Sequence, residues 1–389
     1  MAGTQQDATG AVQDHRFPCP QCGGDLRFAP EQGQLVCAHC GHVEQVRSER
    51  PARQPIPETA FREGIEAALP DAAIEEVRRS RCPNCGAEVE FDPAVHAAEC
   101  PFCAAPVVAD TGATRSIKPR GVAPFLLTEG QAREAMTGWL GRLWFAPSGL
   151  TEYARSGRAM QGVYVPYWTF DADTSSRYSG QRGTVYYTTE QVQVRDPKGH
   201  VRSELRQVAH VRWTPVAGTV SRFFDDVLVL ASRSVPTRHT EALLPWDLTQ
   251  LEPYQPEYLA GFRAEGYTVH LDEGMVEARA YMDRMIERDV RFDIGGDRQQ
   301  IGHIDTDIRD VTFKHILLPV WLAAYRYGGK SYLFVVNGQT GKVKGDRPWS
   351  WIKILFAAIV LAVAVGTFVY VGEREGWFDE ISASIQSGG

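Results

Sequence analysis

Two copies of one cysteine spacing constrain this chain more than any other feature of its sequence. Each copy reads Cys-x2-Cys, fourteen intervening residues, then Cys-x2-Cys. This is the spacing of a zinc ribbon, in which two tight turns each supply two thiolates to one tetrahedral ion. We therefore predict two structural Zn2+ ions, each bound by four cysteines: Cys19, Cys22, Cys37 and Cys40 for the first, and Cys82, Cys85, Cys100 and Cys103 for the second.

The residues around these cysteines favour metal binding over disulfide formation. Proline and glycine flank the first cysteine pair of each copy, at 18–23 and 82–86, as tight turns require. Short strands predicted at 25–28 and 34–36 connect the two turns of the first copy. Disulfides would need an oxidising compartment, yet residues 1–10 lack the basic and apolar regions of a secretory signal. Because four thiolates leave no open coordination position, the metal is predicted to stabilise the fold rather than to catalyse a reaction.

A second strong feature is an uncharged apolar segment near the C-terminus. The segment at 354–371 has eighteen residues without a charge, and Ile352 extends it beyond Lys353. That length can cross a bilayer, whereas a buried core helix, the alternative, usually keeps a polar stripe. Basic residues precede the segment and mainly acidic residues follow it. We therefore predict a transmembrane helix at 352–371, with the large N-terminal part in the cytoplasm.

Composition and periodicity indicate a folded, mildly acidic protein. With 43% hydrophobic residues the chain can bury a substantial core, and its net charge of −7 argues against a general binder of polyanions. Between the cysteine copies, Thr59 fits a helix N-cap before a helical pattern at 61–69, and a second short helix is predicted at 72–79.

The region after the second cysteine copy is predicted to be rich in strands. One helix is expected at 129–143, with Thr128 and Gln131 forming a capping box, and another at 273–288. Strands are predicted where Val, Tyr, Thr and Trp alternate with polar residues: 162–170, 182–189, 191–195, 204–214, 226–231, 267–271, 301–311, 315–327, 330–337 and 341–344.

The predicted fold class is therefore α+β, with two small zinc ribbons, a mixed sheet-rich domain and one C-terminal transmembrane helix. The expected organisation along the chain is a disordered N-terminus at 1–14, the first zinc ribbon at 15–47, a helical linker at 48–80, the second zinc ribbon at 81–109, a sheet-rich cytoplasmic domain at 115–348, the transmembrane helix at 352–371 and a short acidic tail at 372–389.

No catalytic motif accompanies these elements. The segment 337–343 resembles a phosphate-binding loop, but Val336 stands where that motif needs glycine and Val343 stands where it needs Ser or Thr. Asn337 and Gly338 between two strand patterns favour a hairpin turn instead. All eight cysteines are assigned to metal, and no known nucleophile or dinucleotide motif is present. The chain is therefore predicted to be a non-enzyme without a nucleotide site.

Several segments together resemble a group of bacterial zinc-ribbon membrane proteins. The resemblance covers most of 17–371 and rests on the double cysteine spacing, the terminal apolar span and four further segments: 164–172, 245–248, 316–327 and 337–343. Members are often labelled as the primosomal replication-restart helicase, and related proteins occur beside flotillin-type scaffold proteins and phage-shock-type stress proteins. A helicase activity is not expected here, because the Walker A loop is missing.

Two classes of function follow. The first is a membrane-anchored, non-enzymatic adaptor in the bacterial cytoplasmic membrane, recruiting flotillin-type or phage-shock-type protein partners for membrane stress or organisation. The second is a membrane-tethered zinc-ribbon protein that binds nucleic acid. Basic residues in both ribbons are balanced by acidic ones, which favours the adaptor. An uncharacterised activity in the sheet domain stays a third possibility, because sites assembled from distant residues leave no local motif.

Overall fold

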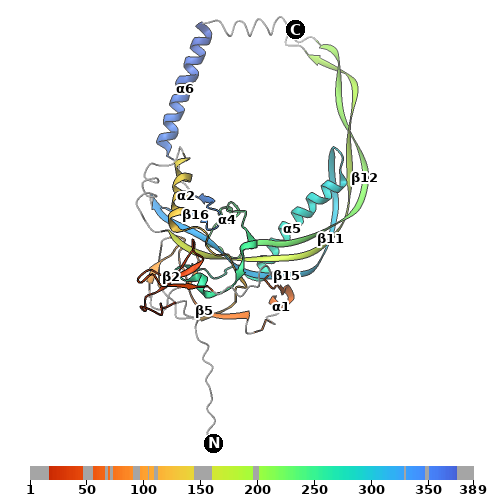
Figure 1. The fold of residues 1–389 in the computed structure, drawn as a ribbon. Helices are drawn as coiled ribbons and strands as arrows, with labels where there is room; N and C mark the ends of the chain where they lie inside the picture. The colour runs from red at the N-terminus through yellow and green to blue at the C-terminus, as the bar shows by residue number, and fades with distance from the viewer. Residues whose placement is uncertain are drawn as a thin grey trace.

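The computed structural model describes residues 17–46, 56–65, 69–70, 73–90, 97–103, 105–108, 113–143, 160–195, 201–327, 330–346 and 350–374. The predicted disordered N-terminus at 1–14 and almost all of the tail at 372–389 lie outside these residues. Figure 1 shows a sheet-rich α+β body from which a long curved pair of strands and one isolated helix project.

Three exceptionally long strands form the curled centre of the body. They are β11 (Gln161–Arg195), β12 (Val201–Leu230) and β15 (Arg298–Tyr327), and β11 lies between the other two in antiparallel pairing. The sheet is completed by short strands β4 (Thr59–Ala60), β10 (Gly121–Val122), β13 (Glu252–Pro253) and β14 (Arg263–Ala264), and by β16 (Lys330–Asn337) and β17 (Val343–Gly345). Several strands predicted separately, such as 182–189 and 191–195, are thus parts of one continuous strand.

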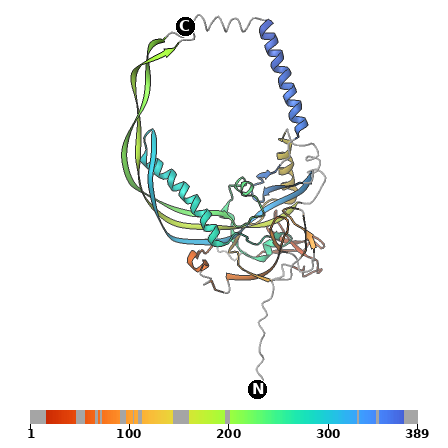
Figure 2. The same cartoon turned by 180° about the vertical axis from the view of Figure 1, so that it is seen from behind.

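The third strand ends before the other two, and this leaves a two-stranded extension. Gly183 of β11 pairs both with Arg298, the first residue of β15, and with Trp213 of β12. Beyond this point β11 and β12 continue as a pair from Thr184↔Arg212 to Arg195↔Val201. We call these residues, 184–195 and 201–212, the hairpin arm. Figures 1 and 2 show that it curves away from the body on the flank opposite the C-terminal helix and in the same general direction as that helix.

The long helix α5 (Leu271–Ile294) covers one face of the sheet at the base of the arm. Its buried residues recur every three or four positions, so that one stripe faces the sheet: Leu271, Gly274, Ala278, Met282, Ile286, Val290 and Ile294. At Gly274 a Cβ atom would lie 2.8 Å from the Trp168 ring, so the glycine allows the close approach of helix and strand. The helix predicted at 273–288 is therefore present and longer at both ends.

The remaining helices are short, apart from two. Helix α2 (Glu129–Gly141) has the predicted capping box between Thr128 and Gln131 and packs near β16 and β17. Helix α6 (Trp351–Arg374) follows β17 closely and makes no substantial packing contact with the described part of the body. The short elements are α1 (Phe61–Ile65), α4 (Thr237–Glu241), η2 (Leu248–Gln250) and η3 (Pro256–Leu259).

Two further predictions of local structure were wrong. The helix predicted at 72–79 is a strand, β5 (Ile74–Arg81), because it pairs with β9 (Ala113–Ile117) and β6 (Glu88–Glu90). The strand predicted at 267–271 is an irregular segment that leads into α5, whose first residue is Leu271. In both cases partners distant in the sequence outweigh the local pattern.

Both cysteine copies lie in small antiparallel sheets. The first consists of β1 (Leu26–Ala29), β2 (Gln34–Cys37) and β3 (Val43–Gln45), which agrees with the strands predicted at 25–28 and 34–36. The second uses the β5–β6 pair and the pair β7 (Ala97–Glu99) and β8 (Pro106–Val108). Buried residues of both copies belong to the hydrophobic clusters of the body, so both ribbons pack against the body.

Candidate metal centres

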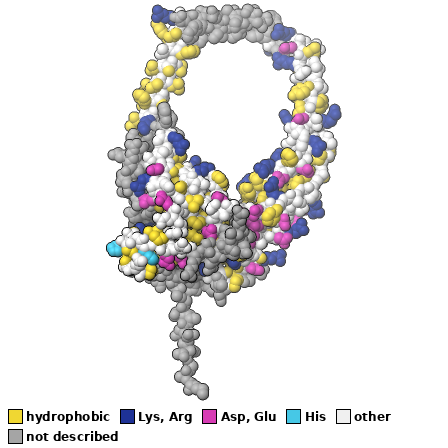
Figure 3. Space-filling view, viewed as in Figure 1, with side chains coloured by type: hydrophobic (Ala, Val, Ile, Leu, Met, Phe, Trp, Pro, Cys, Tyr) yellow, Lys and Arg dark blue, Asp and Glu magenta, His cyan; other side chains and the backbone are white. Residues whose placement is uncertain are grey.

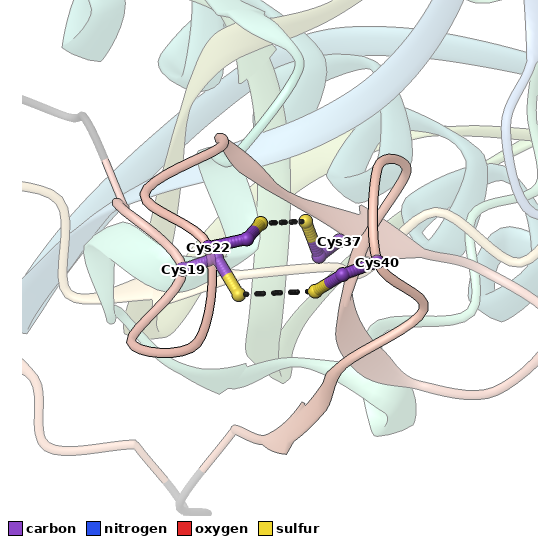
Figure 4. Close-up of side chains that lie close together, drawn as sticks. All are labelled: Cys19, Cys22, Cys37 and Cys40. Atoms are coloured by element: carbon purple, nitrogen blue, oxygen red, sulfur yellow. Dashed lines mark hydrogen bonds between the residues drawn. The ribbon is translucent and has the colours of Figure 1, made fainter.

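The first cysteine copy forms a compact cluster of four thiols (Figure 4). Cys19 Sγ lies 3.6 Å from Cys40 Sγ, and Cys22 Sγ lies 3.5 Å from Cys37 Sγ. The first turn brings Cys19 and Cys22 together, and the turn after β2 brings in Cys37 and Cys40. The four residues that the spacing groups together in sequence are therefore neighbours in space.

Glycines shape both turns of this first cluster. Gly23 and Gly41 follow the second cysteine of each turn with φ of +73° and +74°, a left-handed conformation that favours glycine. Their N–H groups donate to the carbonyl oxygens of Cys19 and Cys37 at 2.9 and 3.0 Å. Gly24 leaves room for the sulfurs, because a Cβ there would lie 3.4 Å from Cys22 Sγ.

Local hydrogen bonds prepare one thiol in each cluster for ionisation. Backbone N–H groups of Cys40 and His39 lower the pKa of Cys37 to about 6. In the second cluster the Cys85 thiol, followed by backbone N–H groups including that of Phe102, lowers the pKa of Cys100 to about 5. The pKa of the neighbouring thiols Cys22 and Cys85 is raised, so in each cluster one thiol of a close pair ionises more readily than the other. Thiolates are the form in which cysteine binds a metal.

The second copy repeats this geometry inside the body. Cys82 Sγ lies 3.6 Å from Cys103 Sγ, and the same distance separates Cys85 Sγ from Cys100 Sγ. Gly86 has φ of +76° and its N–H donates to the Cys82 carbonyl at 2.9 Å, as in the first turn of the other copy. The two clusters are thus built by the same local rules.

The sulfur spacing fits a tetrahedral ion. Four thiolates about 2.3 Å from one Zn2+ stand about 3.8 Å from one another, close to the separations observed in both clusters. In each copy the four Sγ atoms lie within 4.8 Å of one another. All eight cysteines are free thiols rather than disulfides. Two four-cysteine sites compatible with zinc are therefore present.

The clusters differ in exposure, although their geometry is the same. Cys22 and Cys40 of the first copy are exposed, whereas Cys82, Cys100 and Cys103 of the second are buried. The second cluster is covered by the body core that includes Val163, Val165 and Tyr167. The sequence contains no sign of this asymmetry, because both copies have the same spacing.

A third polar cluster, which the sequence did not predict, lies in the body where β11, β12 and β15 run side by side. Lys314 Nζ donates to Glu58 and forms an ion pair with Asp226, each at 2.7 Å, while Asp171 Oδ1 accepts from the Asp226 N–H at 2.8 Å. The residues meet where β11 changes register with both neighbouring strands. The alternation of charged with apolar residues in these strands was the one sequence pattern that could have indicated this cluster.

The chemistry of this third cluster is that of an internal ion pair. Three carboxyl groups lie close enough to hold a metal, but the Lys314 ammonium already supplies a cation to two of them. Burial, followed by the Glu58 carboxylate, raises the pKa of Asp171 to about 7, so a proton neutralises much of the remaining charge. We interpret the cluster as a structural ion-pair network that stabilises the packing of β11, β12 and β15.

The segment 337–343 forms the predicted hairpin turn between β16 and β17. Asn337 Oδ1 accepts from the N–H groups of Gln339 and Thr340 at 2.8 and 2.9 Å. The Asn337 side chain, itself buried, also donates to the Leu243 carbonyl at 3.0 Å. The asparagine therefore organises the turn rather than a phosphate site.

Helix α6 is long and apolar enough to cross a membrane. Its stretch Trp351–Val371 has 21 residues with a mean hydropathy of 2.7, and none of its most apolar window is buried. Figure 3 shows the hydrophobic side chains along this helix open to the surroundings. The predicted span at 352–371 coincides with this stretch.

Comparisons with known proteins agree with the site geometry. Residues 13–45 match the family model described as the zinc-finger of RNA-polymerase I-specific TFIIB, Rrn7. The chain is also similar to the uncharacterized protein YdjG of Bacillus subtilis (strain 168), with 27% identity over 356 residues, which are 91% of this chain and 95% of that protein. No solved structure gives a significant match. Fold and sites together define a double zinc-ribbon protein with one possible membrane-spanning helix.

Proposed function

We propose that this protein is a membrane-anchored, non-enzymatic adaptor that holds two structural Zn2+ ions and recruits protein partners at the cytoplasmic face of a bacterial membrane. The observation that carries the proposal is α6, an apolar helix that no described part of the protein covers. An apolar surface of that size is stable in water only if something else covers it, and a bilayer matches its length.

The zinc ions would have a structural role in this adaptor. Each closed set of four thiolates would hold one ion without an open coordination position, so the metal supplies folding energy and no reactive water. The ribbons in turn pack on the sheet through Phe28 and Phe102, among other buried residues. Metal binding would thereby order surfaces of the body available to partners, including flotillin-type or phage-shock-type proteins.

Nucleic-acid binding is the second candidate, since the first ribbon matches a model named for a transcription factor. The charge of that ribbon argues against it. Within the ribbon at 15–47, Arg16, Arg27 and Arg47 are balanced by Asp25, Glu31 and Glu44, which gives a net charge of 0 and no basic stripe.

Affinity purification of the full-length chain from membranes in mild detergent, with and without nuclease, tests the proposal. Co-purified membrane-scaffold or stress proteins that survive nuclease treatment support the adaptor. Partners that disappear with nuclease, or nucleic acid in the eluate, favour the second candidate. A variant lacking 351–371 is the control, and we expect it in the soluble fraction. If it remains in the membrane fraction, α6 is not the anchor.

A further inference from the structure

The hairpin arm is a long surface that the body does not use. Both strands are exposed over most of their length, and among the described residues no third strand pairs with either outer edge beyond Gly183. A two-stranded hairpin without a packed face is only marginally stable in water. A partner that covers one face would therefore stabilise the arm.

The two faces of the arm differ in charge. Residues opposite each other in an antiparallel pair share a face, so the register assigns each side chain. Ten consecutive positions on one face carry no charge: Val185, Tyr187, Thr189, Gln191 and Gln193 on β11, and Ser203, Leu205, Gln207, Ala209 and Val211 on β12. We call this the uncharged face. Tyr187 and Leu205, two of its large members, are 66% and 71% exposed.

The opposite face carries most of the arm's charge, and that charge is positive. Arg202, Arg206 and Arg212 lie on this face with Glu190 and Glu204. This face has a net charge of +1. Arg195 at the tip, which the register places on the side of the uncharged face, brings the arm to +2 in a chain whose net charge is −7. Figure 3 shows hydrophobic patches beside basic side chains on this part of the molecule.

The position of the hairpin arm relative to α6 limits which partners can reach the arm. Five residues, 346–350, separate β17 from α6, and they span at most about 18 Å. If α6 crosses a bilayer, the body therefore lies at the bilayer surface. The arm and α6 rise from opposite flanks of the body and extend in the same general direction in both views, so the arm reaches toward the surface that α6 would enter (Figures 1 and 2).

We propose that the hairpin arm lies in the headgroup layer of an anionic lipid membrane, with its uncharged face toward the acyl chains and its arginines toward lipid phosphates. This inference rests on the membrane anchor of the proposed function. Open strand edges and arginines exclude the arm from the hydrocarbon core. Exposed tyrosine, tryptophan and aliphatic residues beside arginines are typical of the interface, and Trp213 at the base of the arm adds to them.

Hydrogen–deuterium exchange of the full-length protein tests this placement. We would compare amphipol, which presents no lipid surface, with nanodiscs of phosphatidylcholine alone and with nanodiscs containing about one third phosphatidylglycerol. We expect exchange in peptides from 184–195 and 201–212 to slow at least several-fold in anionic nanodiscs and less in neutral ones. Exchange in α5 peptides serves as the internal reference, because that helix packs on the body.

Paired variants separate the two faces. Tyr187→Ser with Leu205→Ser removes large apolar groups from the uncharged face and should abolish the protection. Tyr186→Ser with Val208→Ser changes the opposite face to a similar extent and should retain it. Unchanged α5 exchange shows that each variant is folded. Tryptic cleavage at Arg202 and Arg206, slowed by anionic nanodiscs in the native chain, provides a second readout.

The results that would overturn the inference are distinct. Equal arm exchange in amphipol and anionic nanodiscs contradicts it while leaving the anchor intact. Protection that appears in amphipol only at high protein concentration assigns the face to a second copy, and protection that requires added duplex DNA assigns it to nucleic acid. If the chain does not enter nanodiscs at all, the membrane anchor itself fails.

Discussion

The ring of Phe28 in the first ribbon packs edge-on against the ring of Tyr258 in the body, with centroids 5.4 Å apart. Beside it, the Phe28 N–H donates to the carbonyl oxygen of Ala260 at 2.9 Å. One residue of β1 thus connects the metal-binding ribbon to the body through both its side chain and its backbone. We therefore expect metal binding by the ribbon to order the adjoining surface of the body.

Phe28→Ala should release the first ribbon from the body. Removing a buried phenylalanine costs about 3–5 kcal/mol, although the ribbon's own metal site leaves its local fold largely intact. We expect faster hydrogen exchange across 26–37 and unchanged exchange in α5. Val43→Ala is the matched control, because Val43 lies in the same small sheet but is exposed. Equal effects of the two substitutions would contradict the docking contact.

The difference in cysteine exposure predicts two rates of metal release. A chelator should reach the first site through Cys22 and Cys40, which are exposed, well before it reaches the buried second site. We expect two kinetic phases of about one Zn2+ each, followed by absorbance of a zinc-binding dye. In the Cys22→Ser variant the fast phase should disappear, whereas in Cys82→Ser the slow one should. A single phase for two ions would argue that burial does not control release.

Lys314→Met should destabilise the body where β11, β12 and β15 run side by side. The substitution leaves Glu58 and Asp226 without their shared cation. Because these carboxylates are 26% and 25% exposed, the cost should fall below the roughly 3–5 kcal/mol of a fully buried pair. Arg177→Gln breaks an exposed pair with Asp305 in the same sheet and should cost under about 1 kcal/mol. Thermal unfolding in detergent measures both. A small loss for Lys314→Met would mean that the carboxyl groups take up protons in its absence.

Asp171→Asn should make stability less dependent on pH. The folded-state pKa of Asp171 is about 7, above the ordinary value of 3.8, so the folded protein retains a proton that the unfolded chain releases. Stability is therefore lost as pH rises from about 4 through 7. The lowered pKa of Glu58 acts in the opposite sense, and its stabilisation is lost as pH falls below 4.5.

Asparagine mimics the protonated side chain and can keep the hydrogen bond from the Asp226 N–H. We expect the variant and the native chain to have similar melting temperatures below pH 3.8, and the variant to become increasingly the more stable of the two as pH rises through 7. Asp305→Asn, at an exposed position of the same sheet, is the control and should follow the native chain. Parallel pH curves for Asp171→Asn and the native chain would contradict a shared proton at this cluster.

The sequence alone determined the features that depend on local spacing. Two thiolates separated by two intervening residues meet when the chain between them forms a tight turn, so the spacing of the cysteines predicts the ligand sets of both ribbons. An uncharged apolar segment such as 354–371 can be identified from the sequence because its hydropathy is summed over consecutive residues. The capping box at Thr128 and the Asn337 turn are equally local, since each is closed within a few residues.

Only the tertiary structure decided how these parts meet. Lys314 and Glu58 are 256 residues apart, and no periodicity links them. Residues 74–81 form a strand rather than a helix because partners arrive from elsewhere in the chain. The burial of one cysteine cluster, the exposure of the other and the length of the hairpin arm all depend on which surfaces pack together. Packing is a property of distant contacts, and these leave little trace in any short stretch of sequence.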